Sequence, residues 1–185
     1  MLFYKVNKFI GGKRMLKNKR LFKSIAILAI IVFSMFMLTG CEFGSKKEEE
    51  KKKEAYEEPI SNLVKGLEEA NSQKFLSAFP SFISDYVKDV FTDDYMKEVL
   101  NQSKETYGEN LTMNYTVTKT EDISKENLES QQQQIKELYG KEITISNGKK
   151  VEVEIVTKGD AKEDKDTDSF EVYEIDGKWC IIDFN

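Results

Sequence analysis

The sequence predicts an α+β domain over residues 59–185, with helices first and a curved antiparallel sheet of about five strands after them. Two patterns carry this prediction. From Pro59 to about Leu100 apolar residues recur every three or four positions, as on one face of a helix. From Leu111 they alternate with polar residues, as on a half-buried strand. Helices followed by strands are typical of α+β folds, in which the helices cover one face of the sheet.

Four short helices are expected in the first part of this domain. Pro59 suits the first turn of the first helix, and an apolar face follows it at positions i, i+3, i+4 and i+7: Ile60, Leu63, Val64 and Leu67. A third helix is expected to run from Phe82 to Phe91. Asn71 or Ser72 is expected to cap the start of the second helix, and Pro80 to end it. Thr92 is expected to cap the start of the fourth. The aromatic and methionine residues on these helices are interpreted as hydrophobic core.

The strands are expected to form one single strand and two hairpins. The single strand begins at Leu111. The first hairpin spans Glu142–Ile155, and a three-residue loop, Ser146–Gly148, keeps its apolar faces in register. The second hairpin spans Phe170–Phe184 with a two-residue turn. This turn, Asp176-Gly177, pairs Glu174 with Trp179, Tyr173 with Cys180 and Val172 with Ile181.

One helix is expected between the first strand and the first hairpin. Ser124 can cap its start, and Gly140 can end it in the left-handed conformation that glycine adopts readily. Its apolar residues are Leu128, Ile135 and Leu138.

Charge is distributed unevenly and excludes one class of function. Residues 1–40 hold eight of the 28 basic residues and no acidic one. The remaining 20, all lysines, face 33 acidic residues in residues 41–185, a net charge of about −13. Such a domain is a poor match for nucleic acid, which binds basic patches. The chain has no histidine, which removes the commonest general base and transition-metal ligand, and no cofactor is expected.

The first 40 residues have the order of a secretory signal. A basic segment, Lys17–Lys23, precedes an apolar run, Ile25–Leu38. As a helix the run would be about 21 Å long, at about 1.5 Å per residue, which is short for a bilayer core of about 30 Å. An uncleaved signal anchor is the alternative. We expect translation to begin at Met15, which would make residues 1–14 an artefact of the assigned start.

The run ends in Leu38-Thr39-Gly40-Cys41, which resembles the lipobox of bacterial lipoproteins: an apolar residue, two small residues and cysteine. The resemblance implies cleavage after Gly40 and a diacylglyceryl group on the Cys41 sulfur. The mature protein would then be held at the outer face of the cell membrane. Cys180 would stay a free, buried thiol; a Cys41–Cys180 disulfide is the alternative.

Residues 41–58 are predicted to tether the domain to this anchor. They are rich in lysine and glutamate and hold only three apolar residues, Phe43, Ala55 and Tyr56, after Cys41. A helical stalk and an extended spacer both fit this composition. We expect either to hold the domain away from the lipid headgroups.

Two segments of the domain, Leu63–Phe79 and the end of the chain from Val172 ("VYEIDGKWCIIDF"), resemble NTF2-like or cystatin-like domains of small Gram-positive lipoproteins. This resemblance implies a curved sheet wrapped around helices, often with an apolar pocket. Tyr115, Tyr173 and Trp179 are the residues expected to line such a pocket. The helix predicted at 125–139 departs from the simplest form of this fold.

Three functions are considered for the domain. The first is a non-enzymatic binding or interaction module, whose partner is an envelope protein or a small ligand. The second is an enzyme of ketosteroid-isomerase type, which the resemblance suggests, with Asp183 as base and Tyr115 as oxyanion donor. The third is weak calcium binding by an acidic loop at 160–168, where Asp164, Asp166 and Asp168 mimic a calcium loop that lacks its glycine and its final glutamate. The first is favoured, and a solvated hairpin loop is the preferred account of the acidic residues.

Overall fold

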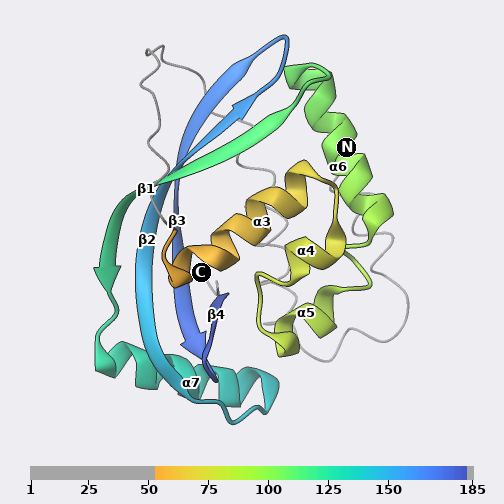
Figure 1. Ribbon diagram of the computed structural model, residues 1–185. Helices are drawn as coiled ribbons and strands as arrows, with labels where there is room; N and C mark the ends of the chain where they lie inside the picture. The colour runs from red at the N-terminus through yellow and green to blue at the C-terminus, as the bar shows by residue number, and fades with distance from the viewer. Residues whose placement is uncertain (1–52, 183–185) are drawn as a thin grey trace. The chain divides into compact units, whose positions relative to one another are not determined.

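The computed structural model describes residues 53–182, which form an α+β domain with the helices first. The α+β class is therefore confirmed (Figure 1). The elements are a 3₁₀ turn η1 (Ala55–Glu57), helices α3 (Glu58–Glu68), α4 (Ser72–Leu76), α5 (Ser81–Val87), α6 (Asp93–Tyr107) and α7 (Lys125–Tyr139), and strands β1 (Thr112–Asp122), β2 (Ile145–Lys158), β3 (Glu163–Ile175) and β4 (Lys178–Ile181).

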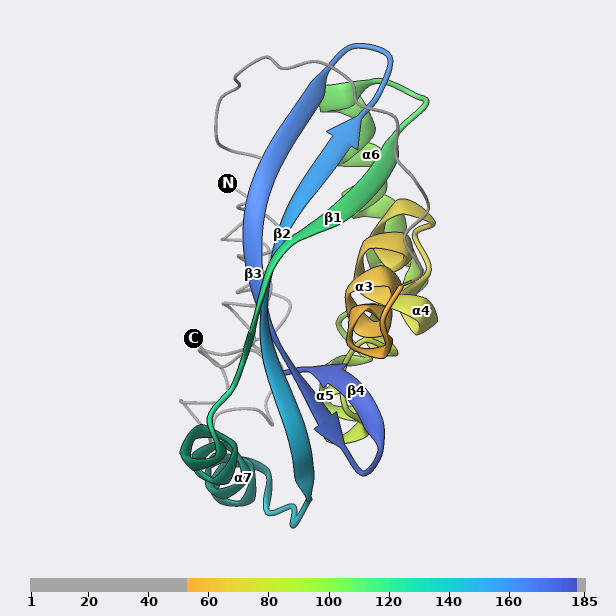
Figure 2. The same cartoon turned by 60° about the vertical axis from the view of Figure 1, so that its left-hand side comes forward.

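Within these residues the sheet has four antiparallel strands in the order β1-β2-β3-β4, and not the five that the sequence predicts. The two central strands are long and visibly curved (Figure 2). β3 pairs with β2 along its whole length, whereas β4 pairs only with its last part, from Val172 to Ile175.

The missing strand results from a wrong prediction at Asn147-Gly148. These residues lie inside β2, where they pair with Glu174 and Tyr173, and the expected turn is only a register shift between Ile145 and Asn147. A Cβ at position 148 would lie 2.7 Å from Leu128 Cδ2 and 3.0 Å from Tyr173 Cδ1. Gly148 therefore serves close packing, which the local sequence pattern of a turn does not reveal.

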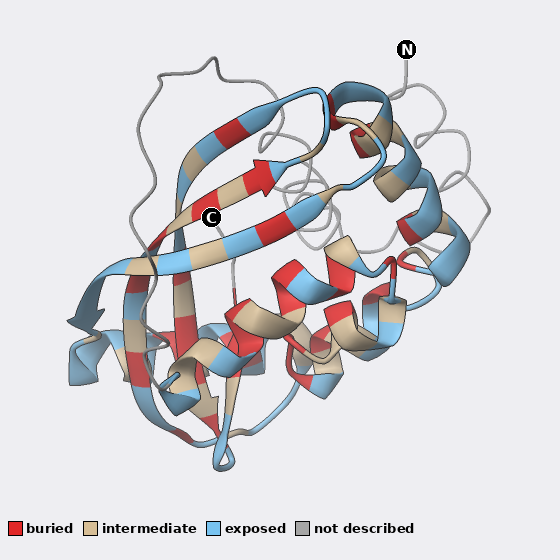
Figure 3. Cartoon of the chain, turned by 45° about the horizontal axis from the view of Figure 1, so that its top comes forward, coloured by how far each residue is buried: buried red, intermediate tan, exposed pale blue. Residues whose placement is uncertain are grey.

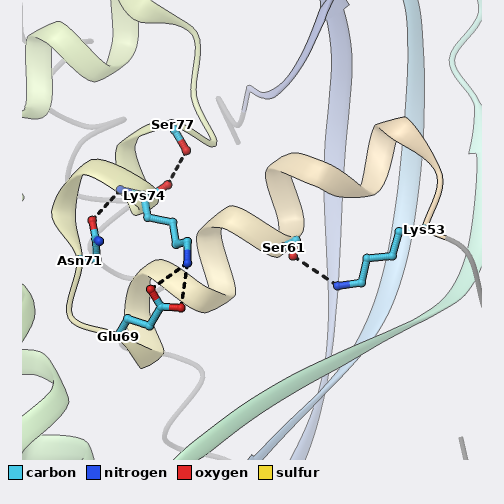
Figure 4. Close-up of polar contacts among 6 residues, drawn as sticks. All are labelled: Lys53, Ser61, Glu69, Asn71, Lys74 and Ser77. Atoms are coloured by element: carbon cyan, nitrogen blue, oxygen red, sulfur yellow. Dashed lines mark hydrogen bonds and ion pairs between the residues drawn. The ribbon is translucent and has the colours of Figure 1, made fainter. Parts of the chain in front are cut away.

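Helices α3, α4 and α5 lie on one side of the sheet in Figure 2, and the apolar face predicted for α3 is buried. The caps predicted for α4 and α6 are confirmed, because Asn71 accepts from the Lys74 N–H (Figure 4) and Thr92 from the Tyr95 N–H. Pro80 precedes α5 instead of ending α4. The third helix stops at Val87, short of the predicted Phe91.

The core between these helices is aromatic. The ring of Phe75 lies 5.5 Å from that of Phe79 and 5.1 Å from that of Phe91, measured between centroids. Phe91 is therefore buried although it follows the helix. α3 and α4 approach closely at Gly66, where a Cβ would lie 2.5 Å from the Phe75 nitrogen. Figure 3 shows the resulting buried stripes on the helices and the sheet.

Helix α7 lies at the far end of the sheet, with both predicted caps in place. The Ser124 hydroxyl accepts from the Asn127 N–H, and Gly140 is left-handed with φ of 65°. The helix packs against β2 through the buried Ile135, and its Gln132 Oε1 accepts from the Ile145 N–H at 2.7 Å.

The C-terminal hairpin has the predicted register. Glu174 pairs with Trp179, Tyr173 with Cys180, and Val172 with Ile181. Asp176 and Gly177 have φ values of 51° and 80°, as a tight hairpin turn requires at both central residues. Among residues 53–182 no helix combines the length and the apolar character needed to cross a membrane.

Candidate functional site

The predicted lipid-attachment residue Cys41 and the motif Leu38-Thr39-Gly40 before it lie outside the described residues. Asp183, the base of the isomerase hypothesis, also lies outside them. Within the domain, the candidate site residues are the three predicted aromatic residues and the polar groups that the fold brings together.

Tyr115 and Trp179 both contact the segment through which the chain enters the domain. The Trp179 ring meets the Tyr56 ring edge-on, with centroids 6.1 Å apart, and the Tyr115 hydroxyl donates to the Glu57 carbonyl oxygen at 3.4 Å. Lysines complete this arrangement: Lys53 Nζ lies 4.6 Å from the Tyr115 ring centroid, and Lys149 Nζ lies 5.4 Å from that of Tyr56. We refer to these five contact residues, Lys53, Tyr56, Tyr115, Lys149 and Trp179, as the Tyr56 cluster.

Tyr173 lies elsewhere. Its ring is beside Gly148, in the same small space as Leu128 of α7. Its hydroxyl donates to Glu171 Oε2 at 2.7 Å, and burial, followed by this carboxylate, raises the pKa of Tyr173. The structure therefore brings Tyr115 and Trp179 to the Tyr56 cluster and keeps Tyr173 apart from it, under α7.

A buried polar group joins the end of α6 to the turn between β2 and β3. The Tyr107 hydroxyl donates to Asp164 Oδ2 at 3.0 Å, and Lys162 Nζ forms an ion pair with the same oxygen. Tyr107 has no exposed surface and Asp164 is 7% exposed. Burial, followed by the bond to Asp164, raises the pKa of Tyr107 well above its usual value. We call Tyr107, Gly159, Lys162 and Asp164 the Tyr107 clamp.

The backbone contributes as much to this clamp as the side chains. The Tyr107 carbonyl oxygen accepts from the Ala161 N–H at 2.8 Å and from the Lys162 N–H at 3.3 Å. A Cβ at Gly159 would lie 2.2 Å from that oxygen, so only glycine fits here. The last carbonyls of a helix need such partners. The clamp is therefore a helix end held by a turn, and its carboxylate already has two partners.

Of the residues 160–168 predicted to form a solvated hairpin loop, 160–162 lie in the turn between β2 and β3, and Glu163–Asp168 belong to β3. Asp164, Asp166 and Asp168 alternate along one face of that strand, with Phe170 continuing it into the core. Desolvation, followed by the neighbouring Asp164, raises the pKa of Asp166. In the part of the chain that the structure describes, no three His, Cys, Asp or Glu side chains form a group that could hold a metal ion.

The sequence contains a signal for this arrangement. Counting back in twos from Phe170, the core-facing positions of a continuous strand are 168, 166 and 164. Aspartates at these positions break the expected alternation of apolar and polar residues, and such a break is typical of a loop. The partner of Asp164, Tyr107, is far away in sequence and has no local signal.

Cys180 is buried in the C-terminal hairpin and has no disulfide partner among the described residues. Desolvation raises the pKa of its thiol, so the reactive thiolate is disfavoured. The burial agrees with the buried thiol that the sequence predicts.

No family model matches the sequence. No curated protein matches it either.

Proposed function

We propose that this protein is a lipid-anchored protein of the bacterial cell envelope, whose α+β domain acts as a non-enzymatic binding or interaction module. One observation carries the proposal: Leu38-Thr39-Gly40-Cys41 follows a basic segment and an apolar run at the distance that lipoproteins have. The basic segment, the short apolar run and the small residues each have a function in export and processing.

The physical chemistry of lipid anchors fits this order. One acyl chain holds a protein only marginally at a membrane, whereas two chains, at about 0.8 kcal/mol per buried CH₂, hold it stably. A diacylated Cys41 therefore replaces a membrane-spanning helix. The proposed site of action is the outer face of the membrane.

For the domain, we propose kinship with NTF2-like or cystatin-like folds. Helices precede a curved antiparallel sheet and pack on one of its sides, which supports this proposal. The helix α7 between β1 and β2 is the departure from the simplest form.

Binding is favoured over catalysis because Asp164, a buried carboxylate of the described residues, already has a hydrogen-bond donor and an ion-pair partner. Asp164 accepts from Tyr107 and is paired with Lys162, so it is not available as a base. Tyr115, the donor in the isomerase hypothesis, directs its hydroxyl to the Glu57 carbonyl oxygen.

The test uses the two cysteines of the chain as a matched pair. Cells expressing the full chain are labelled with an alkyne analogue of palmitate, and the label on the protein is measured together with its partition into detergent. We expect Cys180→Ala to carry the label like the wild type and Cys41→Ala to lose it entirely. Label on Cys41→Ala, or none on the wild type, would contradict the proposal.

The binding role is tested by chemical crosslinking in intact cells followed by purification. We expect an envelope partner that is recovered with the wild type and with Cys180→Ala. It should be lost with Cys41→Ala, which lacks the proposed site of lipid attachment. The same recovery from all three would contradict an anchored module.

A further inference from the structure

The folded structure begins before α3, inside the segment predicted as a tether. Residues Lys53–Glu57, which we call the strap, include the 3₁₀ turn η1 and lie against α3, β3 and β4. Figure 4 shows Lys53 reaching α3, where its Nζ donates to Ser61 Oγ at 3.3 Å. The strap is therefore the junction between the domain and everything upstream.

Tyr56 makes the central contacts of the strap. Its ring meets Trp179 of β4 edge-on and lies under Lys149 Nζ of β2. Its hydroxyl is 3.5 Å from Thr120 Oγ1 of β1. One side chain of the strap thus touches three strands of the sheet.

The backbone of the strap is also held. The Glu57 N–H donates to the Glu54 carbonyl oxygen at 2.9 Å, and the Glu54 N–H donates to Glu57 Oε1 at 3.1 Å. The Glu57 carbonyl oxygen accepts from the Tyr115 hydroxyl of β1. These bonds fix both the turn and its position on the sheet.

The strap differs from α3 in burial. Lys53, Glu54 and Ala55 are exposed, Tyr56 is half-buried, and η1 has no buried residue. The next helix, in contrast, buries Ile60 completely. Aromatic and cation–π contacts at exposed sites each shift an equilibrium by only a few-fold to about tenfold. The described contacts of the strap are therefore weaker than the buried contacts that hold α3.

We propose that the strap is a releasable latch that sets the length of the lipid tether and the point at which it leaves the domain. This inference rests on the proposed lipid anchor at Cys41. With the strap docked, the 11 residues 42–52 separate the anchor from Lys53, and at about 3.5 Å per residue they span at most about 40 Å. Release frees the five residues Lys53–Glu57 and extends the tether to Glu58, the first residue of α3, which adds at most about 17 Å of reach. Docking keeps the domain near the membrane; release lets it reach further out.

The strap is tested by proteolysis of the full chain in isolated membranes. A lysine-specific endoprotease needs several residues on each side of the cleaved bond in extended form, so docking should protect the Lys53–Glu54 bond. Mass spectrometry of the released domain shows which bond was cut. Lys65, inside α3, reports unfolding of the domain in the same sample.

Three variants are compared with the wild type. Tyr56→Ala should be cut after Lys53 about fivefold to fiftyfold faster, from the loss of its aromatic and cation–π contacts. Tyr56→Phe keeps the ring and should be protected like the wild type. Tyr86→Ala, at an exposed tyrosine outside the strap, should also be protected. None of the variants should be cut faster after Lys65.

Several results would overturn the latch. One is that the wild type is cut after Lys53 as fast as Tyr56→Ala, and another is that Tyr56→Ala shows no acceleration. Faster cutting after Lys65 in Tyr56→Ala would show that the strap cannot separate from the domain. The lipid label on Cys41 is read independently, so a failed latch and a failed anchor give different results.

Discussion

Two tyrosines hold different segments to the same sheet in very different ways. Tyr107 ends α6 and is completely buried, with its hydroxyl 3.0 Å from a carboxylate oxygen. Tyr56 is half-buried, and its hydroxyl is 3.5 Å from the Thr120 hydroxyl. In both cases a lysine Nζ lies 5.4 Å from the centroid of the tyrosine ring. The difference therefore lies in burial and in the hydrogen bond.

Burial decides how costly each contact is to break. A buried polar group that loses its partner costs about 1–3 kcal/mol, whereas an exposed group finds water instead. The Tyr107 clamp should therefore behave as part of the global fold. The Tyr56 cluster should behave as a local contact that opens on its own.

The largest effect is expected for Gly159→Ala in the Tyr107 clamp. The added Cβ would meet the Tyr107 carbonyl oxygen at 2.2 Å and displace the bonds that this oxygen accepts. We expect a loss of about 3 kcal/mol in the free energy of unfolding, measured by chemical denaturation. Gly140→Ala is the control, since it has open space and only its φ of 65° is unfavourable. It should cost about 1 kcal/mol, and equal losses would contradict the steric account.

Tyr107→Phe removes only the hydroxyl of the clamp. Asp164 keeps its ion pair with Lys162 but loses a buried hydrogen bond. We expect a loss of about 2 kcal/mol in the free energy of unfolding. Tyr86→Phe, at a side chain that is 43% exposed, should change it by less than about 0.5 kcal/mol. If Tyr107→Phe leaves the free energy of unfolding unchanged, the hydrogen bond to Asp164 does not contribute to stability.

Tyr56→Ala should affect global stability less than Tyr107→Phe, although it removes a whole ring. We expect a loss of less than about 1 kcal/mol, because the strap is lost before the domain unfolds. Denaturation of the purified full chain measures this. A loss larger than that of Tyr107→Phe would place Tyr56 in the global core.

The smallest expected effect is the contribution of Asp166 to the pH dependence of stability. Its raised pKa means that the folded state holds this proton more tightly than the unfolded state, so stability falls as pH rises through the folded pKa. Asp166→Asn should therefore raise the melting temperature at pH 7 and have no effect near pH 3, where both states are protonated. Glu163→Gln should act in the opposite direction at pH 7, because its bond to Lys158 lowers the pKa of Glu163. The same sign for both variants would contradict these assignments.

The sequence predicts well the helix caps and the hairpin turn that depend on residues close together in the chain. Ser124, Asn71 and Thr92 cap helices because their side chains accept from a nearby backbone N–H, and this pattern is visible in the sequence. The turn at Asp176-Gly177 was equally clear, since it requires positive φ at both residues.

Tertiary contacts explain why the turn predicted at Gly148 and the loop predicted around Asp164 are wrong. Gly148 has the local signature of a turn, but Leu128 and Tyr173 occupy the space where a side chain would be. Asp164 has the local signature of a loop, but a helix end 57 residues away supplies its partner. For the candidate site, the resemblance to NTF2-like domains suggested Tyr115, Tyr173 and Trp179 together, but it does not reveal the separation of Tyr173 from the other two.

The central claim is that Cys41 is the lipid-bearing first residue of the mature protein. The most direct measurement is the mass of the N-terminal peptide of the protein isolated from cell membranes. We predict a peptide that begins at Cys41 and carries a diacylglyceryl group, in the wild type and in Cys180→Ala alike. A peptide that runs uncut through Leu38-Thr39-Gly40 into an unmodified Cys41 would contradict the account.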